Sequence, residues 1–126
     1  MKKLSIITPC YNEEVNVEIC AQELKKVMQE KLSGYDYEHI FADNASTDST
    51  LVKLRELAAK DDHIKVISNS RNVGPFRNMW NAMKSATGDA VVPLLPADLQ
   101  DPPSVIPELV KHWEQGFLVT YGVRAN

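Results

Sequence analysis

Glycine is scarce in this 126-residue sequence, and none of its five glycines lies where a phosphate-binding loop would need one. Dinucleotide-binding turns and P-loops place glycines directly after a strand, because backbone amides must approach the phosphate closely. The first strand-like segment instead continues into "TPCYNEE", residues 8–14, and no Gly-Lys-Ser or Gly-Lys-Thr occurs. Both kinds of phosphate site are therefore excluded.

Cysteine and long apolar runs are also scarce. Cys10 and Cys20 lack the spacing of a metal site, and two unpaired thiols fit a reduced, cytosolic compartment. No segment is apolar for long enough to cross a bilayer, and the N-terminus lacks the apolar core of a signal peptide. We therefore expect a cytoplasmic protein.

An excess of positive charge is absent too. The formal net charge is −3, and the basic residues are scattered along the chain. This argues against nucleic acid or an anionic membrane as the main partner. Hydrophobic residues make up 44% of the chain, which is enough for a core. The length indicates one domain, residues 1–126.

Strand-like and helix-like segments alternate along the whole chain. Apolar segments rich in β-branched residues predict five strands, at 3–10, 37–43, 64–68, 90–95 and 117–123. Apolar residues at helical spacing predict helices between them, over 14–32, 49–60, about 75–87 and 103–116. This order predicts an α/β fold with a mostly parallel sheet of about five strands and helices on both faces.

The apolar stripes of the last two helices give candidate core residues. In the segment 75–87 we expect Phe76, Met79, Trp80 and Met83 to face the sheet. Trp113 lies on the apolar stripe of the following helix. Both tryptophans are therefore expected in the core.

Polar residues gather where the first four predicted strands end, in "PCYNEE", "DNASTD", "NSRN" and "PADLQD". Since the carboxyl ends of parallel strands share one edge of a sheet, these segments predict a single ligand-binding crevice. Its acidic residues would be Glu13, Asp43, Asp98 and Asp101, with Arg71 as the nearby cation. Acidic groups repel bare phosphate, so a phosphorylated ligand would need a divalent cation such as Mg²⁺ or Mn²⁺.

A phospho-receiver domain has a similar length and alternation, and it is the alternative from another functional class. Such a domain needs a phosphoacceptor Asp after the third strand and a Lys after the fifth. The sequence offers "NSRN" and "YGVRAN" at these places, so this reading is weak.

Five motifs in register carry a family resemblance that extends over essentially the whole chain. "TPCYNEE", "FADNASTDST", "SRNVG", "ATGDAVV" and "PADLQDPP" resemble the N-terminal half of family 2 glycosyltransferases of the GT-A fold. They are most similar to dolichol-phosphate-mannose synthases and enzymes that load sugars onto polyprenyl phosphate. The resemblance implies a Rossmann-like nucleotide-binding domain. It also implies metal-assisted, inverting transfer from a UDP- or GDP-linked sugar to a lipid phosphate or a cell-envelope glycan.

The resemblance also assigns roles to individual residues. The base would be held by the chain edge at Pro9 and the ring of Tyr11, supported by Glu13, with Asp43 reading a base N–H. The remaining nucleotide contacts would come from Arg71, which lies against the nucleotide in relatives, and from Asp98, which is also the metal ligand.

Three positions depart from the family pattern. Asn44 and Ala45 replace an Asp and a Gly, and Pro96 replaces the first Asp of the Asp-x-Asp pair. We expect Pro96 to weaken metal binding, because one carboxylate is lost. We expect Asp101 to cap the helix that begins near Pro103 rather than to bind metal.

No catalytic base is assigned within this chain, because the resemblance places the base and the acceptor surface beyond Asn126. The final "TYGVRAN" resembles the strand that precedes them, so we expect a donor-binding fragment that binds nucleotide without transferring sugar on its own. The second hypothesis is a non-catalytic nucleotide-sugar-binding or interaction module, which Pro96 favours. The sugar, base, acceptor and oligomeric state stay open.

Overall fold

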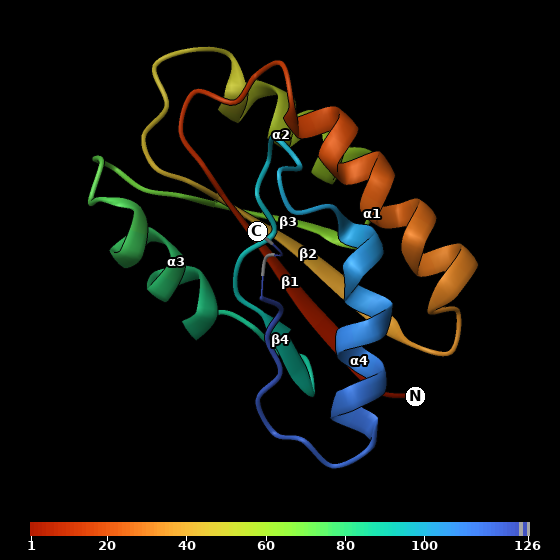
Figure 1. The fold of residues 1–126 in the computed structure, drawn as a ribbon. Helices are drawn as coiled ribbons and strands as arrows, with labels where there is room; N and C mark the ends of the chain where they lie inside the picture. The colour runs from red at the N-terminus through yellow and green to blue at the C-terminus, as the bar shows by residue number, and fades with distance from the viewer. Residues whose placement is uncertain (124, 126) are drawn as a thin grey trace.

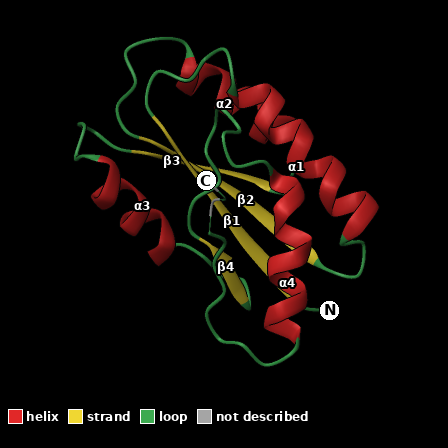
Figure 2. Ribbon diagram, in the orientation of Figure 1, coloured by secondary structure: helices red, strands yellow, loops and turns green. Residues whose placement is uncertain are grey.

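A computed structural model describes residues 1–123 and 125, and it shows the predicted alternation of strands and helices (Figures 1 and 2). Each of the first four predicted strands and all four predicted helices is present, with ends that differ by a few residues. The elements are β1 (Lys3–Cys10), α1 (Val17–Lys31), β2 (Asp36–Asp43), α2 (Thr50–Lys60), β3 (Ile64–Ser68), α3 (Pro75–Lys84), β4 (Ala90–Val92), the 3₁₀ turn η1 (Pro103–Val105) and α4 (Ile106–Glu114).

The four strands form one parallel sheet in the order β3-β2-β1-β4. β1 and β2 pair along their full length, from Lys3 opposite Asp36 to Cys10 opposite Asp43. β2 and β4 flank β1 on opposite sides, so the direction of chain winding reverses at β1. Ligands of open parallel sheets bind beyond the carboxyl ends of the strands at such a reversal. The topology therefore places a ligand crevice after β1 and β4.

Helices cover both faces of the sheet, as the sequence predicts. The larger core lies beneath α1, α2 and α4, and it includes Ile6, Leu24 and Phe41. The smaller core lies beneath α3, around Ile7 and Ile40 (Figure 1). Ile6 and Ile7 serve opposite cores because successive side chains of a strand point to opposite faces. None of the helices in the described part of the chain combines the length and hydropathy needed to cross a bilayer.

The predicted fifth strand, 117–123, is wrong. The segment has no strand structure, and its apolar side chains are largely exposed, with Leu118 at 92%. A strand needs a hydrogen-bonded neighbour, and the described residues supply none. The segment lies beside β4 and α4, where Val123 helps Leu95 and Ile106 to line a cavity of about 360 Å³. Two residues of "TYGVRAN", Arg124 and Asn126, lie outside the described residues.

The predicted orientation of α3 is confirmed for Met83, which packs against the smaller core, and is wrong for Phe76 and Trp80. Phe76 is 80% exposed and Trp80 is 59% exposed, whereas Asn78 and Ala82 are buried against the sheet. The Asn78 amide explains this orientation, since its Nδ2 donates a hydrogen bond of 2.9 Å to the carbonyl of Ala42 in β2. Ala82 is part of the smaller core, and the aromatic rings turn outward. Trp113 on α4 does pack against the larger core, as predicted.

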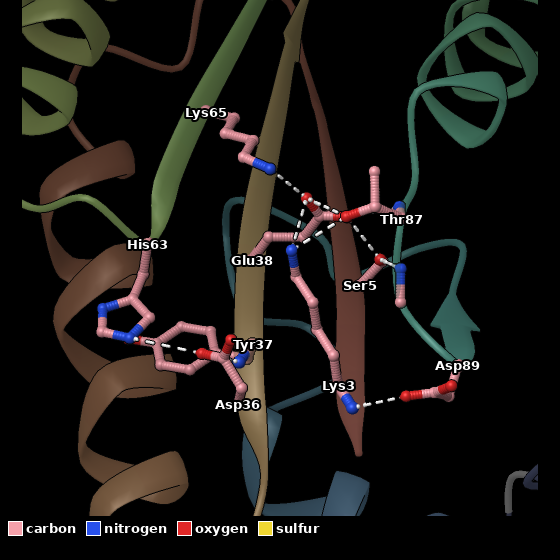
Figure 3. Close-up of polar contacts among 10 residues, drawn as sticks. Lys3, Ser5, Asp36, Tyr37, Glu38, His63, Lys65, Thr87 and Asp89 are labelled. Atoms are coloured by element: carbon pink, nitrogen blue, oxygen red, sulfur yellow. Dashed lines mark hydrogen bonds and ion pairs between the residues drawn. The ribbon is translucent and has the colours of Figure 1, made fainter. Parts of the chain in front are cut away.

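The amino edge of the sheet is tied together by the buried carboxylate of Glu38 (Figure 3). Lys65 on β3 donates to Oε1 at 2.5 Å, and Ser5 on β1 donates to Oε2 at 2.6 Å. The backbone N–H of Thr87, which precedes β4, donates to Oε2 at 2.7 Å. One side chain on β2 therefore connects the strands on both of its sides with the segment that leads into β4.

Gly88 is required for this arrangement. Its N–H donates to the Ser5 hydroxyl at 2.8 Å. A Cβ at this position would lie 2.6 Å from the Ser5 oxygen and 2.8 Å from the carbonyl oxygen of Lys3. These distances are too short for any side chain, so the chain can pass this close to β1 only as glycine.

Removing the Glu38 charge tests how much this network stabilises the fold. Burial raises the pKa of Glu38, but the hydrogen bonds from Lys65, Ser5 and Thr87 outweigh burial and lower the pKa to about 2. We expect Glu38→Gln to lower the free energy of unfolding by about 2 kcal/mol at neutral pH, since charge-assisted bonds are lost. Urea denaturation monitored by circular dichroism measures this loss, with the exposed Glu30→Gln as the control.

The same variant should change the acid limb of the stability profile. The folded pKa of Glu38 is depressed from its ordinary value of 4.5, so its contribution is complete above that pH and is lost as the pH falls towards about 2. In Glu38→Gln the free energy of unfolding should depend less steeply on pH between 4.5 and about 2. Burial lowers the pKa of His39 from 6.5 to about 3, so this residue also makes stability fall as the pH falls from 6.5 to 3. The variant should retain that slope. An unchanged slope below pH 4.5 would contradict the assignment.

Candidate functional site

The loops after β1 and β2 are fastened to each other at the carboxyl edge of the sheet (Figure 1). The backbone N–H of Asn12 donates to the Ser46 hydroxyl at 2.9 Å, and the Asn12 side chain accepts a hydrogen bond of 2.8 Å from the N–H of Thr47. Farther along, the N–H of Glu13 donates to the Thr50 hydroxyl at 2.9 Å. The first two polar segments predicted from the sequence therefore form one unit.

Asp43, the last residue of β2, is buried beneath this unit. The Ser46 hydroxyl donates to its Oδ1 at 2.5 Å, and the Ser46 N–H lies 3.3 Å from Oδ2. Ala45 between them has a φ of 60°, in the left-handed region that glycine adopts most easily. Asp43 thus closes its own turn and orients Ser46, which in turn holds the first loop.

Asn44 fastens the loop after β3 to the same unit. Its side chain is buried, and its Nδ2 donates to Asn72 at 3.0 Å and to the carbonyl of Gly74 at 3.3 Å. Its Oδ1 accepts from Asn69 at 3.1 Å and from the N–H of Val73 at 2.9 Å. The sequence singled out Asn44 only as a departure from a family pattern. The clustered asparagines at 44, 69, 72 and 78 were the available signal for this role.

Arg71 lies in the loop that Asn44 holds, between Asn69 and Asn72. Its side chain is exposed, and it makes no hydrogen bond or ion pair with the described residues. At the first loop, Tyr11 is 46% exposed, and Pro9 and Glu13 are half-buried. These groups are therefore accessible at the carboxyl edge, in contrast to Asp43.

The fourth loop presents Asp98 outward. The N–H of Leu95 donates to the carbonyl of Ile7 at 2.8 Å, which carries the chain along β1 beyond the end of β4. Leu95 and Ala97 are buried, whereas Asp98 between Ala97 and Leu99 is exposed. Leu99 has a φ of 59°, which is rare for a bulky residue and marks a strained turn. Buried neighbours on one side and this turn on the other hold the carboxylate towards solvent.

The acidic residues of separate loops converge on two buried thiols. Burial raises the pKa of Cys20 to about 11, although a hydrogen bond with Thr8 lowers it, and the charges of Glu13 and Asp98 raise it further. Burial, followed by Cys20, Asp43 and Glu13, raises the pKa of Cys10. Glu13 and Asp98 thus both raise the pKa of Cys20, and Ala97 and Leu99 of the fourth loop belong to the same core as Cys10 and Cys20. Such thiols are protonated and inert at neutral pH.

The predicted cap position at Asp101 is off by one residue. The N-cap position of η1 is Pro102, in an extended conformation, and its own side chain forms no cap hydrogen bond. The 3₁₀ turn begins directly at Pro103, which leaves Asp101 one residue too early for the cap. Asp101 is half-buried at the entrance to this turn.

The residues fit a metal–nucleotide complex better than an independent metal centre. Within residues 1–123 and 125, no group of three or more His, Cys, Asp or Glu side chains is placed to hold a metal ion. Asp98 is a hard oxygen donor, and within the described part of the chain only its Oδ1 is engaged, by the N–H of Gln100 at 3.2 Å. Mg²⁺ and Mn²⁺ commonly take one carboxylate and complete their coordination with phosphate oxygens and water. The single exposed carboxylate of Asp98 fits this pattern.

Comparison with protein families and known sequences gives consistent matches. A family model described as Glycosyl transferase family 2 matches residues 5–126. The glycosyltransferase YkcC of Bacillus subtilis is 39% identical over 122 residues, which cover 97% of this chain and 37% of that protein. A prophage bactoprenol glucosyl transferase homolog of Escherichia coli is 34% identical over 114 residues, covering 90% of this chain and 36% of that protein. The chain spans little more than a third of these relatives.

Solved structures share the fold. A mannosyltransferase from Pyrobaculum calidifontis, in complex with GDP-Man and Mn²⁺, superposes with a TM-score of 0.73 at 24% identity over 87% of this chain and 32% of that chain. S. aureus TarS in complex with UDP gives a TM-score of 0.72 at 25% identity, over 90% of this chain and 32% of that chain. Glucosyl-3-phosphoglycerate synthase from Mycobacterium tuberculosis, in complex with Mn²⁺, UDP and phosphoglyceric acid, gives a TM-score of 0.66 at 26% identity, over 89% of this chain and 39% of that chain.

Asn44→Asp tests whether the buried amide holds the loop after β3. The substitution removes two donated hydrogen bonds and points a carboxylate oxygen at the Gly74 carbonyl. We expect a loss of about 2 kcal/mol of stability and faster amide exchange over 69–74. Hydrogen exchange with mass spectrometry measures this, with Asn81→Asp on the exposed side of α3 as the control. Wild-type exchange rates in the variant would show that the loop is held by other contacts.

Proposed function

This chain belongs to glycosyl transferase family 2, and on that premise we propose that it forms the donor-binding part of an enzyme that transfers a sugar from a nucleotide-diphospho-sugar to an acceptor. One observation carries the proposal. The loops after β1, β2 and β3 are hydrogen-bonded into one unit, and the adjacent fourth loop directs Asp98 outward. An edge built in this way can hold a nucleoside diphosphate between an aromatic ring, a guanidinium and a metal-binding carboxylate.

The nucleotide would lie across the first three loops. Tyr11 supplies an exposed ring for the base, next to the chain edge at Pro9, and Glu13 would support this wall, as the family resemblance implies. Arg71 supplies a positive charge for the diphosphate, because its guanidinium has no partner among the described residues. Asp43 is buried, so it contributes by ordering the turn that contains Ser46. It could accept a hydrogen bond from a base N–H only if its bond from the Ser46 hydroxyl opened.

Asp98 would hold a divalent cation, Mg²⁺ or Mn²⁺, against the diphosphate. The bound cation would stabilise the negative charge of the departing nucleoside diphosphate. Arg71 would share this role from the opposite loop, since a fixed cation beside the leaving group costs no reorganisation during the reaction. Structural relatives in complex with Mn²⁺ and with UDP or GDP-Man support this cofactor and this ligand class.

The acceptor in this proposal is a lipid phosphate or a cell-envelope glycan. Relatives named as bactoprenol glucosyl transferases favour a polyprenyl carrier, at the cytoplasmic face of a membrane. Transfer would proceed with inversion, and the base and acceptor surface would come from the part of the relatives that this chain does not span. A nucleotide-sugar-binding module without catalysis is the second candidate, and it is favoured by Pro96 in place of a carboxylate.

Ligand-induced stabilisation tests the donor site. We expect UDP or GDP with Mn²⁺ to raise the melting temperature by about 5 °C at saturation, because ligand binds only the folded state. The same measurement is made with CDP and dTDP in the presence of Mn²⁺, and with UDP, GDP, CDP and dTDP in its absence. Asp98→Asn should remove the Mn²⁺-dependent part, whereas Asp62→Asn, an exposed Asp in the turn between α2 and β3, should not. The absence of a shift with every nucleotide would refute the proposed ligand class.

Restoring the missing carboxylate tests the metal site separately. We expect Pro96→Asp to tighten Mn²⁺ binding in the presence of nucleotide by about tenfold, since a second acidic oxygen adds to charge neutralisation. Pro93→Asp places the same charge in an exposed part of the same loop and serves as the control. Isothermal titration of Mn²⁺ measures both variants. Equal affinity in wild type and Pro96→Asp would argue that Asp98 does not lie at the metal.

A further inference from the structure

We propose that the outer face of α3, formed by Phe76, Arg77, Trp80 and Lys84, docks onto a membrane surface that contains anionic lipid. All four side chains are exposed, with Phe76 at 80% and Trp80 at 59%. Residues three and four positions apart are neighbours on a helix surface, so the aromatic and basic groups share one side of α3. The structure thus presents two large rings and two cations together.

The sheet gives no reason for these rings to be on the surface. α3 is buried through Asn78 and Ala82, and the Asn78 amide fixes this orientation by bonding Ala42 and Asn69. Among the described helices, α3 alone covers its face of the sheet (Figures 1 and 2). No neighbouring helix therefore shields Phe76 or Trp80.

The charge of this segment selects the kind of partner. Residues 69–88 contain three of the 14 basic residues, Arg71, Arg77 and Lys84, and none of the 17 acidic ones. The net charge of −3 had argued against an anionic membrane as main partner, but the average over the chain hides this local excess. A helix face with aromatic rings among Lys and Arg is the pattern of interfacial helices, whose rings enter the headgroup region while their cations meet anionic lipid.

The same charges disfavour a second copy of the chain. A symmetric contact through this face would place Arg77 and Lys84 of both copies close together, and like charges in an interface oppose association. An anionic lipid surface matches both the rings and the cations.

Docking through α3 would also fix the position of the candidate site. The Gly74 carbonyl accepts hydrogen bonds from the backbone N–H of Asn78 at 3.2 Å and from the Asn44 side chain at 3.3 Å. The first turn of α3 is therefore joined to the loop that carries Arg71. A membrane-bound α3 would hold the carboxyl edge of the sheet at a set distance from the bilayer. This inference goes beyond the proposed function and does not depend on nucleotide binding.

Vesicle binding by the 126-residue chain tests the proposal. In a Trp113→Phe background, Trp80 is the only tryptophan. We expect its emission to shift to shorter wavelength with vesicles of phosphatidylcholine and phosphatidylglycerol, and not with phosphatidylcholine alone. Added salt should reverse the shift, because it screens the headgroup charge. Should Trp113→Phe fold poorly, cosedimentation of the unsubstituted chain with the same vesicles gives the same comparison.

Paired variants separate the contribution of the basic residues to vesicle binding from that of the aromatic rings. Arg77→Glu with Lys84→Glu, and Phe76→Ser with Trp80→Ser, should each lower the vesicle partition coefficient in cosedimentation by about tenfold or more. Ile19→Ser with Lys26→Glu makes the same type of change on exposed residues of α1, on the other face of the sheet, and should leave binding unchanged.

Three results would overturn the proposal. They are no binding to anionic vesicles at low salt, equal binding to neutral vesicles, and wild-type binding by both paired α3 variants. A Trp80 shift that grows with protein concentration without lipid, together with a dimer in sedimentation analysis, would instead assign the face to a second copy. The melting-temperature shift with nucleotide and Mn²⁺ is measured separately in the paired variants. It reports on the donor site alone, so a failure of the membrane surface can be told apart from a failure of the donor site.

Discussion

The buried amide of Asn44 is the contact on which the carboxyl edge of the sheet depends. It lies directly after β2, and its nitrogen and oxygen together meet four partners in the loop after β3. A buried amide left unpaired costs more than a paired one contributes, so this side chain specifies one arrangement of that loop. The positions of Arg71 and of the first turn of α3 both follow from it.

The two edges of the sheet are built on different principles. At the amino edge, Glu38 gathers hydrogen bonds from both neighbouring strands and from the segment before β4, which stabilises the sheet. At the carboxyl edge, the three described non-glycine residues with positive φ, Asn12, Ala45 and Leu99, occupy the loops after β1, β2 and β4. Strained backbone persists only where surrounding contacts hold it, and it is often found at functional sites. At the carboxyl edge these contacts are the hydrogen bonds among the loops themselves.

The fold was largely predictable from the sequence, and its two errors have physical causes. Periodicity in segments such as 3–10 and 64–68 reports burial, so the first four strands and all helices were found. Residues 117–123 are equally apolar, but a strand also needs a partner, and periodicity does not report partners. In α3 the apolar stripe was right for Met83 but wrong for Phe76 and Trp80, because a hydrogen bond from Asn78 to β2 outweighed the burial of the two rings.

The sequence by itself determined the parallel α/β order and the gathering of polar loops at one edge, because alternating apolar segments and strand-end chemistry are local properties of the chain. It also named the exposed groups at that edge, Tyr11, Arg71 and Asp98. Only the tertiary structure decided that Asp43 is buried, that Asn44 joins two loops, and that α3 turns its rings outward. The role of Asn44 and the orientation of α3 depend on hydrogen bonds between residues more than 20 positions apart, and local patterns carry no information about such partners.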